Sequence, residues 1–213
     1  MDDHASSFGA AAAAYARHRP DYAEAAVRWA LEPPAGPRVL DLGAGTGKLT
    51  ATLVSAGADV IAVEPDPAML GELRGELPDV RALPGRAEAI PLPDASVDAV
   101  LAGNALHWFD MAVAGLARVS GSAAIGPRDT PAGWRAETAG FGSAERAEFP
   151  HGQRRTADSL VATLATRAGM LVMPERERTA VLGRIRAFLA RTPETADGEF
   201  TFPMLTCVLR ITS

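Results

Sequence analysis

The sequence predicts an α/β fold with a doubly wound, mostly parallel sheet and helices on both faces. Short segments that are apolar throughout, such as residues 38–42 and 59–64, alternate with helical segments as far as residue 119. Strands that are buried on both faces and joined by helical crossovers are typical of parallel sheets. In addition, a loop with three glycines follows the first strand, at the sheet edge where open α/β sheets bind ligands.

Each element has a local signal. The alanine-rich residues 5–18 favour a helix that Arg19-Pro20-Asp21 interrupts, and a second helix over 22–31 ends at a proline-rich stretch. The core elements are then expected, in chain order, as strand 38–42, helix 48–55, strand 59–64, helix 67–77, strand 80–83, strand 96–102 and helix 110–119. Beyond residue 119 the pattern weakens, and the expected elements are helices at 130–139, 157–168 and 175–190 and strands at 146–149 and 200–211.

The composition suits one ordinary globular domain. A chain of 213 residues can bury one full core, and a net charge of −5 with a pI near 5.4 gives no basic face for nucleic acid. Cys207 is the only cysteine, which excludes an intrachain disulfide, and its apolar setting favours a buried thiol. No metal site is supported, and no apolar run approaches the roughly 18 to 20 residues of a membrane span. The N-terminus starts with acidic residues and lacks the basic segment followed by an apolar segment that is typical of a signal peptide. We therefore expect a cytoplasmic protein without nucleic-acid, membrane or metal partners, and leave its oligomeric state open.

The loop in the segment VLDLGAGTGKLT has three interpretations, which its spacing distinguishes. A phosphate loop of NTPases would need a glycine where Leu42 stands and a hydroxyl where Leu49 stands. A dinucleotide turn would need its third glycine at Lys48. The pattern that fits is acid-x-Gly-x-Gly-x-Gly, formed by Asp41, Gly43, Gly45 and Gly47. Such glycines let the backbone turn sharply beside a ligand, and a strand-end carboxylate would repel a pyrophosphate but suit a cationic amine.

A second acid ends the next strand. Glu64 lies 17 residues after Gly47, an interval at which a strand-end acid can accept hydrogen bonds from both hydroxyls of a ribose. Alone, Glu64 would be an ordinary charged strand terminus. Together with the glycine loop, it predicts a site for a ligand that carries a ribose.

Three segments together, DLGAGTG (41–47), Glu64 and GRAEAIPLPDASVD (85–98), resemble the class I S-adenosylmethionine-dependent methyltransferases with a methyltransferase type 11 domain. The resemblance is close over residues 8–119 and implies a Rossmann-like fold that binds S-adenosyl-L-methionine and releases S-adenosyl-L-homocysteine. It implies that the methionine part is held by Asp41, Gly43, Ala44, Gly45, Thr46 and Gly47 and lined by Asn104 and Ala105. It further implies that Glu64 binds the ribose, Pro65 and Met69 one face of the adenine, and Ala87 and Glu88 the adenine edge.

The segment GNALHWFD (103–110) follows the fourth strand and is similar to the HWFD segment of small-molecule methyltransferases that include the trans-aconitate type. Its position makes His107 the candidate catalytic residue and Trp108 a substrate-side residue. By themselves the residue types also fit a loop histidine and a core aromatic. The N-terminal segment matches the same family, in which it closes over the cofactor. Its candidate lid and substrate residues are Phe8, Tyr15, Arg19 and Tyr22.

The resemblance implies a single methyltransferase domain over residues 1–213. It would consist of an N-terminal helical lid (1–36), a cofactor-binding core (37–119), a helical insertion that caps the site (150–195) and an antiparallel last strand (199–213). The expected activity is methyl transfer from S-adenosyl-L-methionine to a small-molecule acceptor, at oxygen. Two alternatives stay open: a nicotinamide-dependent oxidoreductase, and a noncatalytic cofactor-binding protein with the same fold.

One stretch departs from the family pattern. Residues 116–127, LARVSGSAAIGP, offer scarcely three strand-like residues where the family has a long apolar fifth strand. A parallel sheet without an interior strand would leave backbone groups unpaired. Either the chain is truly shortened here, which would put the substrate wall and the activity in question, or residues near 111–120 are missing from the numbered sequence. We favour the second explanation.

Overall fold

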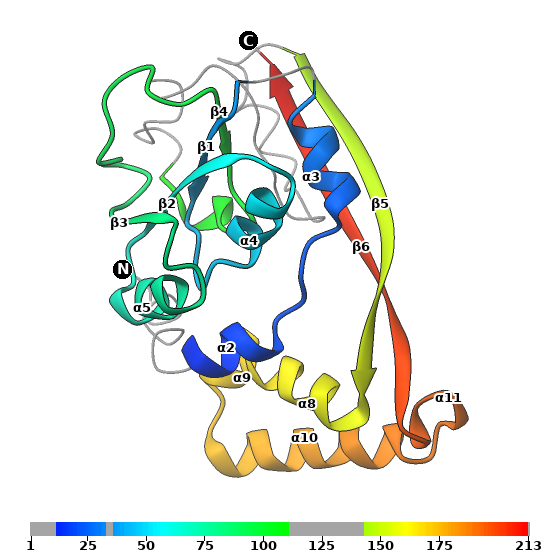
Figure 1. The fold of residues 1–213 in the computed structure, drawn as a ribbon. Helices are drawn as coiled ribbons and strands as arrows, with labels where there is room; N and C mark the ends of the chain where they lie inside the picture. Colours follow the sequence, from blue (N-terminus) through cyan, green and yellow to red (C-terminus); the bar gives the residue numbers. More distant parts are fainter. Residues whose placement is uncertain (1–11, 33–35, 111–142, 213) are drawn as a thin grey trace. The chain divides into compact units, whose positions relative to one another are not determined.

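The computed structural model describes residues 12–32, 36–110 and 143–212 (Figure 1). The chain forms two compact units. We name residues 21–149 with 205–213 the sheet unit, and residues 1–20 with 150–204 the helical unit. The expected helices at 110–119 and 130–139 and the weak stretch at 116–127 lie wholly or almost wholly outside the described residues.

The sheet unit contains a four-stranded parallel sheet, which confirms the predicted fold class. Its strands are β1 (Arg38–Leu42), β2 (Asp59–Glu64), β3 (Arg81–Pro84) and β4 (Ala99–Leu101), in the order β3-β2-β1-β4. β1 and β2 have the predicted bounds, whereas β4 is shorter than expected. In the register, Asp41 lies beside Ala62 of β2 and Leu101 of β4. The carboxyl ends of β1 and β2 therefore meet at one edge of the sheet.

Three helices pack with the sheet through their apolar sides: α3 (Glu24–Ala30), α4 (Lys48–Ser55) and α5 (Pro67–Glu76). α4 begins directly after Gly47. α5 begins with Pro67, and the Asp66 side chain caps it by accepting from the N–H groups of Ala68 and Met69. One cluster joins α3 and α4 to β1, β2 and β4 through Ala26, Val27, Leu49, Leu53, Val39, Val60 and Leu101. A second cluster joins α5 to β2 and β3 through Leu70, Leu73, Ala62 and Ala82.

A third cluster involves the connection between β3 and β4. Leu40, Leu42, Val63 and Val100 pack there with Ala87, Ile90, Leu92 and Val97 of this connection and with Leu106. Apolar clusters therefore lie against both sets of alternating side chains of β1, as expected for a strand that is buried on both faces.

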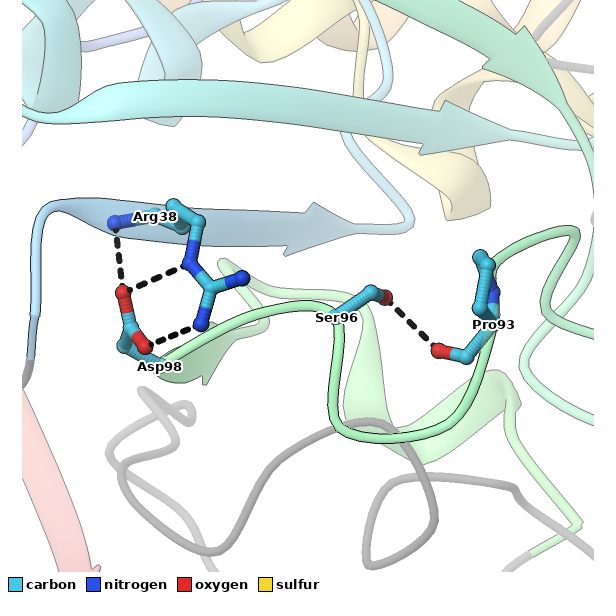
Figure 2. Close-up of polar contacts among 4 residues, drawn as sticks. All are labelled: Arg38, Pro93, Ser96 and Asp98. Carbon is cyan, nitrogen blue, oxygen red and sulfur yellow. Dashed lines mark hydrogen bonds and ion pairs between the residues drawn. The ribbon is translucent and has the colours of Figure 1, made fainter.

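The amino ends of β1 and β4 are joined by an ion pair between Arg38 and Asp98 (Figure 2). The Asp98 carboxylate accepts from the Arg38 backbone N–H at 3.0 Å, from Nε at 3.1 Å and from a terminal guanidinium nitrogen at 2.7 Å. Figure 2 also shows Ser96, whose Oγ donates a 2.7 Å hydrogen bond to the Pro93 carbonyl. The end of the segment 85–98 thus stabilises the amino edge of the sheet, opposite to the strand-end acids.

Two long strands, β5 (Ser143–Thr156) and β6 (Glu199–Thr212), pair in a separate two-stranded sheet and run antiparallel (Figure 1). The expected antiparallel last strand is therefore present, and it pairs with a strand much longer than the predicted 146–149. The boundary between the two units falls within both strands. Cys207 on β6 is a buried free thiol, as predicted.

The helical unit contains α2 (Ala12–His18), α8 (Ala157–Ala165), α9 (Ala168–Leu171), α10 (Glu175–Leu189) and α11 (Pro193–Ala196). Thr156 and Ser159 form a reciprocal capping box at the start of α8. The Thr163 hydroxyl donates a 2.7 Å hydrogen bond to the His18 carbonyl and so ties α8 to α2. No helix in the described ranges is long and apolar enough to cross a membrane.

Candidate functional site

The turn between β1 and α4 depends on glycine. Gly43, Gly45 and Gly47 all have positive φ, at 71°, 57° and 87°, in a region that is costly for residues with a Cβ. The N–H groups of Gly43 and Ala44 both donate to the Val63 carbonyl, at 2.8 and 3.1 Å. A Cβ on Gly43 would lie 2.6 Å from the Cβ of Ala105. The turn is therefore held close to the end of β2 and to the segment that follows β4.

Asp41 is fully buried beneath this turn. Thr50 Oγ1 donates a 2.6 Å hydrogen bond to Oδ2 of Asp41, while Oδ1 is buried without a hydrogen-bond partner among the described residues. Burial raises the pKa of Asp41 to about 7, the hydrogen bond from Thr50 opposes the rise, and the charge of Glu64 adds to it. A buried carboxylate oxygen without a partner is costly, and a cationic group of a ligand would offset that cost.

Glu64 ends β2 and is 6% exposed. Its Oε2 accepts from the Gly45 N–H at 2.8 Å, and its Oε1 accepts from the Asp66 N–H at 2.9 Å. Burial raises the pKa of Glu64, although the hydrogen bonds from Asp66 and Gly45 act in the opposite direction. Each carboxylate oxygen keeps further acceptor capacity, so the oriented Glu64 can accept hydrogen bonds from a pair of hydroxyls.

The residues proposed for the adenine lie on two segments. Met69 on α5 is buried, and its Sδ would be 3.8 Å from a Cβ on Gly45, whereas Pro65 is exposed. Ala87 is buried, and the Glu88 carboxylate accepts from the Asp110 N–H at 2.9 Å. Partial burial acts to raise the pKa of Glu88, but hydrogen bonds led by that from Asp110 lower it overall. Glu88 is thus a charged acceptor.

The segment after β4 approaches both the glycine turn and the N-terminal region of the sheet unit. Asn104 has a positive φ of 54°, and its Nδ2 donates a 2.9 Å hydrogen bond to Oη of Tyr22. Ala105 is buried against Gly43. His107 lies in the 3₁₀ turn η2 (Leu106–Trp108). Trp108 is 42% exposed, which argues against the core-aromatic alternative for this residue.

The remaining candidate residues belong to other parts of the chain. Tyr15 and Arg19 are in the helical unit, where the Arg19 guanidinium lies 4.6 Å from the centre of the Tyr15 ring. Arg19 Nε is buried without a hydrogen-bond partner among the described residues. Phe8 lies outside the described residues. The sheet unit therefore brings together the cofactor candidates and Tyr22, but not Tyr15 or Arg19.

Sequence reasoning missed Thr50, the hydrogen-bond partner of Asp41. The available signal was a polar residue at a buried position of an amphipathic helix: Leu49 and Leu53 define the buried side of α4, and Thr50 lies between them. It also missed Phe109, whose ring carbons would lie 3.3 Å from a Cβ on Gly43. The contact of Phe109 depends on how the chain turns after β4, for which the sequence has no local signal.

The fold and the site define a class of protein. A parallel α/β sheet carries two buried acids at the carboxyl ends of neighbouring strands, beside a turn of three left-handed glycines. Oδ1 of Asp41 and Oγ1 of Thr46 are buried without a hydrogen-bond partner in the part of the chain that the structure describes, so both atoms can serve a ligand. This donor set fits the amino-acid end of a cofactor such as S-adenosylmethionine, with Glu64 placed for hydroxyl groups.

Comparison with known proteins supports this class. Residues 40–121 match the family model described as a methyltransferase domain. Over 97% of its length the chain is 40% identical to an uncharacterized methyltransferase of Mycobacterium tuberculosis (strain ATCC 25618 / H37Rv), and it covers 95% of that protein. A solved structure from Anaeromyxobacter dehalogenans, described as a candidate type II methyltransferase, is similar with a TM-score of 0.69 and 27% identity, over 91% of this chain and 97% of that one. The chain therefore belongs to the class I S-adenosylmethionine-dependent methyltransferases.

A shorter match concerns the malonyl-(acyl-carrier protein) O-methyltransferase of Methylococcus capsulatus, at 38% identity over 53% of this chain and 46% of that protein. The longer mycobacterial alignment contains gaps, which bear on the two explanations for the weak stretch at 116–127. It has 232 positions, whereas 97% of 213 residues is about 207, so about 25 positions are gaps in this chain. Both explanations account for gaps of this number, so the expectation of missing residues near 111–120 stays a prediction.

Proposed function

We propose that this methyltransferase transfers a methyl group from S-adenosyl-L-methionine to a small-molecule acceptor, at an oxygen atom. The observation that carries the proposal is the buried Oδ1 of Asp41, which has no partner among the described residues and lies at the carboxyl end of β1. A cationic amine is the group that best compensates such an oxygen. The methionine part of the cofactor supplies that amine.

The proposed binding mode divides the cofactor between three groups of residues. The turn from Gly43 to Gly47 would hold its methionine part, with Asn104 and Ala105 lining it. In this turn Ala44 is buried, and the Thr46 hydroxyl has no hydrogen-bond partner among the described residues. Its ribose hydroxyls donate to Glu64, whose carboxylate is already oriented by two backbone N–H groups. Its adenine packs on Pro65 and Met69, with Ala87 and the charged acceptor Glu88 at its edge.

The acceptor side is proposed from the segment after β4. The net charge of −5 supports a small molecule over a nucleic acid. The bound cofactor supplies an activated methyl group on a sulfonium, so the protein mainly aligns the acceptor and excludes water. For a hydroxyl acceptor His107 would take the proton, whereas a carboxylate acceptor needs no base. Oxygen as the acceptor atom is supported by the O-methyltransferase of Methylococcus capsulatus, which is similar over half of this chain. The proposed substrate and lid residues are Trp108, Tyr22, Phe8, Tyr15 and Arg19.

Equilibrium binding of S-adenosyl-L-homocysteine, measured by calorimetry, tests the proposal. Saturable binding that Asp41→Asn weakens strongly is expected, with Asp79→Asn as the control because it removes an equivalent charge from an exposed turn. Absence of binding by the unaltered chain would sink the proposal. A titration with NADH, monitored by the fluorescence of NADH, distinguishes the proposed function from the oxidoreductase alternative.

Binding and turnover are measured separately because a noncatalytic protein with this fold would bind the cofactor without transferring its methyl group. Methyl transfer from radiolabelled S-adenosyl-L-methionine is followed on a panel of carboxylic acids, phenols and alcohols. Turnover on at least one oxygen acceptor is expected. Cofactor binding without transfer to any member of a broad panel would favour the noncatalytic alternative.

A further inference from the structure

We propose that Thr50 is a positioning residue for the cofactor site: its hydroxyl holds Oδ2 of Asp41 so that Oδ1 is presented to the ammonium group of the cofactor. The inference rests on the proposed function, because it assigns Oδ1 to that ammonium group. Thr50 itself does not touch the cofactor. It acts through Asp41.

The geometry leaves the Asp41 carboxylate little freedom. Thr50 lies in the first turn of α4, nine residues after Asp41, and neither residue is exposed to solvent. Their 2.6 Å hydrogen bond is short, as expected for a hydroxyl that donates to a carboxylate. Within the described ranges Oδ2 has a hydrogen-bond donor and Oδ1 has none, so only Oδ1 is left for a ligand.

The surroundings of Asp41 make Thr50 the main group that favours its charged form. On the neighbouring strand β2, Glu64 contributes a negative charge that disfavours ionisation of Asp41. On the other side, β4 consists of Ala99, Val100 and Leu101, which carry no charge. On α4, the Lys48 ammonium pairs with Asp21 at 3.1 Å. The hydrogen bonds from Thr50 are the factors that lower the pKa of Asp41 against burial and Glu64.

Loss of the hydroxyl would have two effects on binding. The carboxylate would no longer be held with Oδ1 toward the ligand. In addition, the pKa of Asp41 would rise further, since only the backbone hydrogen bond from Thr50 would still oppose burial and the charge of Glu64. Near neutral pH a larger share of the chains would then carry a protonated Asp41, which cannot pair with an ammonium group. The loss of affinity should therefore be greater at low pH than at high pH.

The experiment compares Thr50→Val, which keeps the shape of the side chain, with Thr50→Ser, which keeps the hydroxyl. The matched control is Thr52→Val on the same helix, since Thr52 donates to the Lys48 carbonyl and not to Asp41. Two ligands are titrated by calorimetry: S-adenosyl-L-homocysteine, and 5′-methylthioadenosine, which lacks the ammonium group. Titrations are run at about pH 6.5 and about pH 8.5.

For Thr50→Val we expect S-adenosyl-L-homocysteine to bind about tenfold more weakly than to the unaltered chain at the lower pH, and within about threefold of it at the higher pH. Binding of 5′-methylthioadenosine should not change, and Thr50→Ser and Thr52→Val should behave like the unaltered chain. In an Asp41→Asn background, Thr50→Val should have no further effect. Should Thr50→Val not fold, Thr50→Ala takes its place in the same comparison.

Several outcomes would overturn the proposal. An equal loss for both ligands at both pH values would mean that Thr50 only supports the fold. Unchanged binding of S-adenosyl-L-homocysteine by Thr50→Val would remove the positioning role while leaving the proposed function intact. No binding of S-adenosyl-L-homocysteine by the unaltered chain would overturn the proposed function itself, so the two failures are distinguishable.

Discussion

Glu64 Oε2 accepts a 2.8 Å hydrogen bond from the backbone N–H of Gly45, which lies 19 residues earlier in the chain. This bond joins the end of β2 to the glycine turn between β1 and α4. A second bond, from the Asp66 N–H to Oε1, fixes the other oxygen. These two hydrogen bonds hold the turn and the acid in one arrangement through groups of the protein itself.

The first prediction concerns Glu64→Gln. An amide has one acceptor oxygen, so its NH₂ group must face either the Gly45 or the Asp66 N–H, and one buried donor loses its acceptor. We expect the affinity for S-adenosyl-L-homocysteine to fall by roughly ten- to hundredfold, at a cost of about 1.5 to 3 kcal/mol, as measured by calorimetry. The control is Glu72→Gln, because Glu72 is a partly buried glutamate on α5. Equal affinities for Glu64→Gln and the control would contradict the assigned role.

The second prediction concerns the stability of Asp41→Asn in the absence of cofactor. The pKa of Asp41 is raised from 3.8 to about 7, so the folded chain binds a proton that the unfolded chain releases. This contribution to stability is fully present below about pH 4 and is lost as the pH rises through about 7. Asparagine has no such dependence, and its amide oxygen can still accept from Thr50.

Asp41→Asn should therefore be more stable than the unaltered chain at about pH 8, by on the order of a few kcal/mol, with little difference at about pH 4. Urea unfolding at both pH values measures this. If Asp41→Asn were less stable than the unaltered chain at both pH values, burial of the charged Asp41 carboxylate would not have the expected cost in folding free energy. The same substitution should weaken cofactor binding, so stability and function oppose each other at this residue.

The third prediction concerns Gly43→Ala. The added Cβ would lie 2.6 Å from the Cβ of Ala105, at a φ of 71°. Gly57→Ala is the matched control, since Gly57 also has a positive φ, of 91°, but nothing lies within 4 Å of its Cβ position. We expect the control to lose about 1 kcal/mol and Gly43→Ala roughly 2 kcal/mol or more in free energy of unfolding. Similar losses in free energy of unfolding for the two variants would mean that Ala105 can move away from the added Cβ at little cost.

The fourth prediction concerns Asp98→Asn. The hydrogen bonds from Arg38 lower the pKa of Asp98, so the stability that Asp98 contributes is present at neutral pH and is lost on acidification through its folded pKa. Asp98→Asn should lower the melting temperature at neutral pH and show a shallower fall in acid than the unaltered chain. Affinity for S-adenosyl-L-homocysteine should be unchanged, because the pair lies at the opposite edge of the sheet from Glu64. A large loss of affinity would contradict this separation.

The fifth prediction concerns His107→Ala. If the acceptor is a hydroxyl, kcat should fall by about 10²- to 10⁴-fold, the usual contribution of a general base, while calorimetry shows unchanged binding of S-adenosyl-L-homocysteine. If the acceptor is a carboxylate, kcat should change little. Loss of cofactor affinity in this variant would place His107 at the cofactor instead of the acceptor.

Much of the cofactor region could be predicted because its signals are local. The strands at 38–42 and 59–64 and the helix at 48–55 have the predicted bounds, since apolar runs and a terminal glycine mark them. The strand at 146–149 was underestimated: β5 covers Ser143–Thr156, and its length is set by pairing with β6, which follows more than forty residues later. Such long-range pairing has no counterpart in a short window of sequence.

By itself, the sequence determined where the chain must turn without a Cβ and which strands end in an acid, because both properties belong to single residues and their spacing. Only the tertiary structure decided what those acids experience. It buried Asp41 and gave one of its oxygens Thr50 as a hydrogen-bond donor, while the other oxygen has no partner among the residues that the structure describes. It also placed Glu64 close enough to raise the pKa of Asp41. Burial and the distance between charges arise from the packing of separate segments, so the pKa values and hydrogen-bond partners of these acids could not be predicted from the sequence.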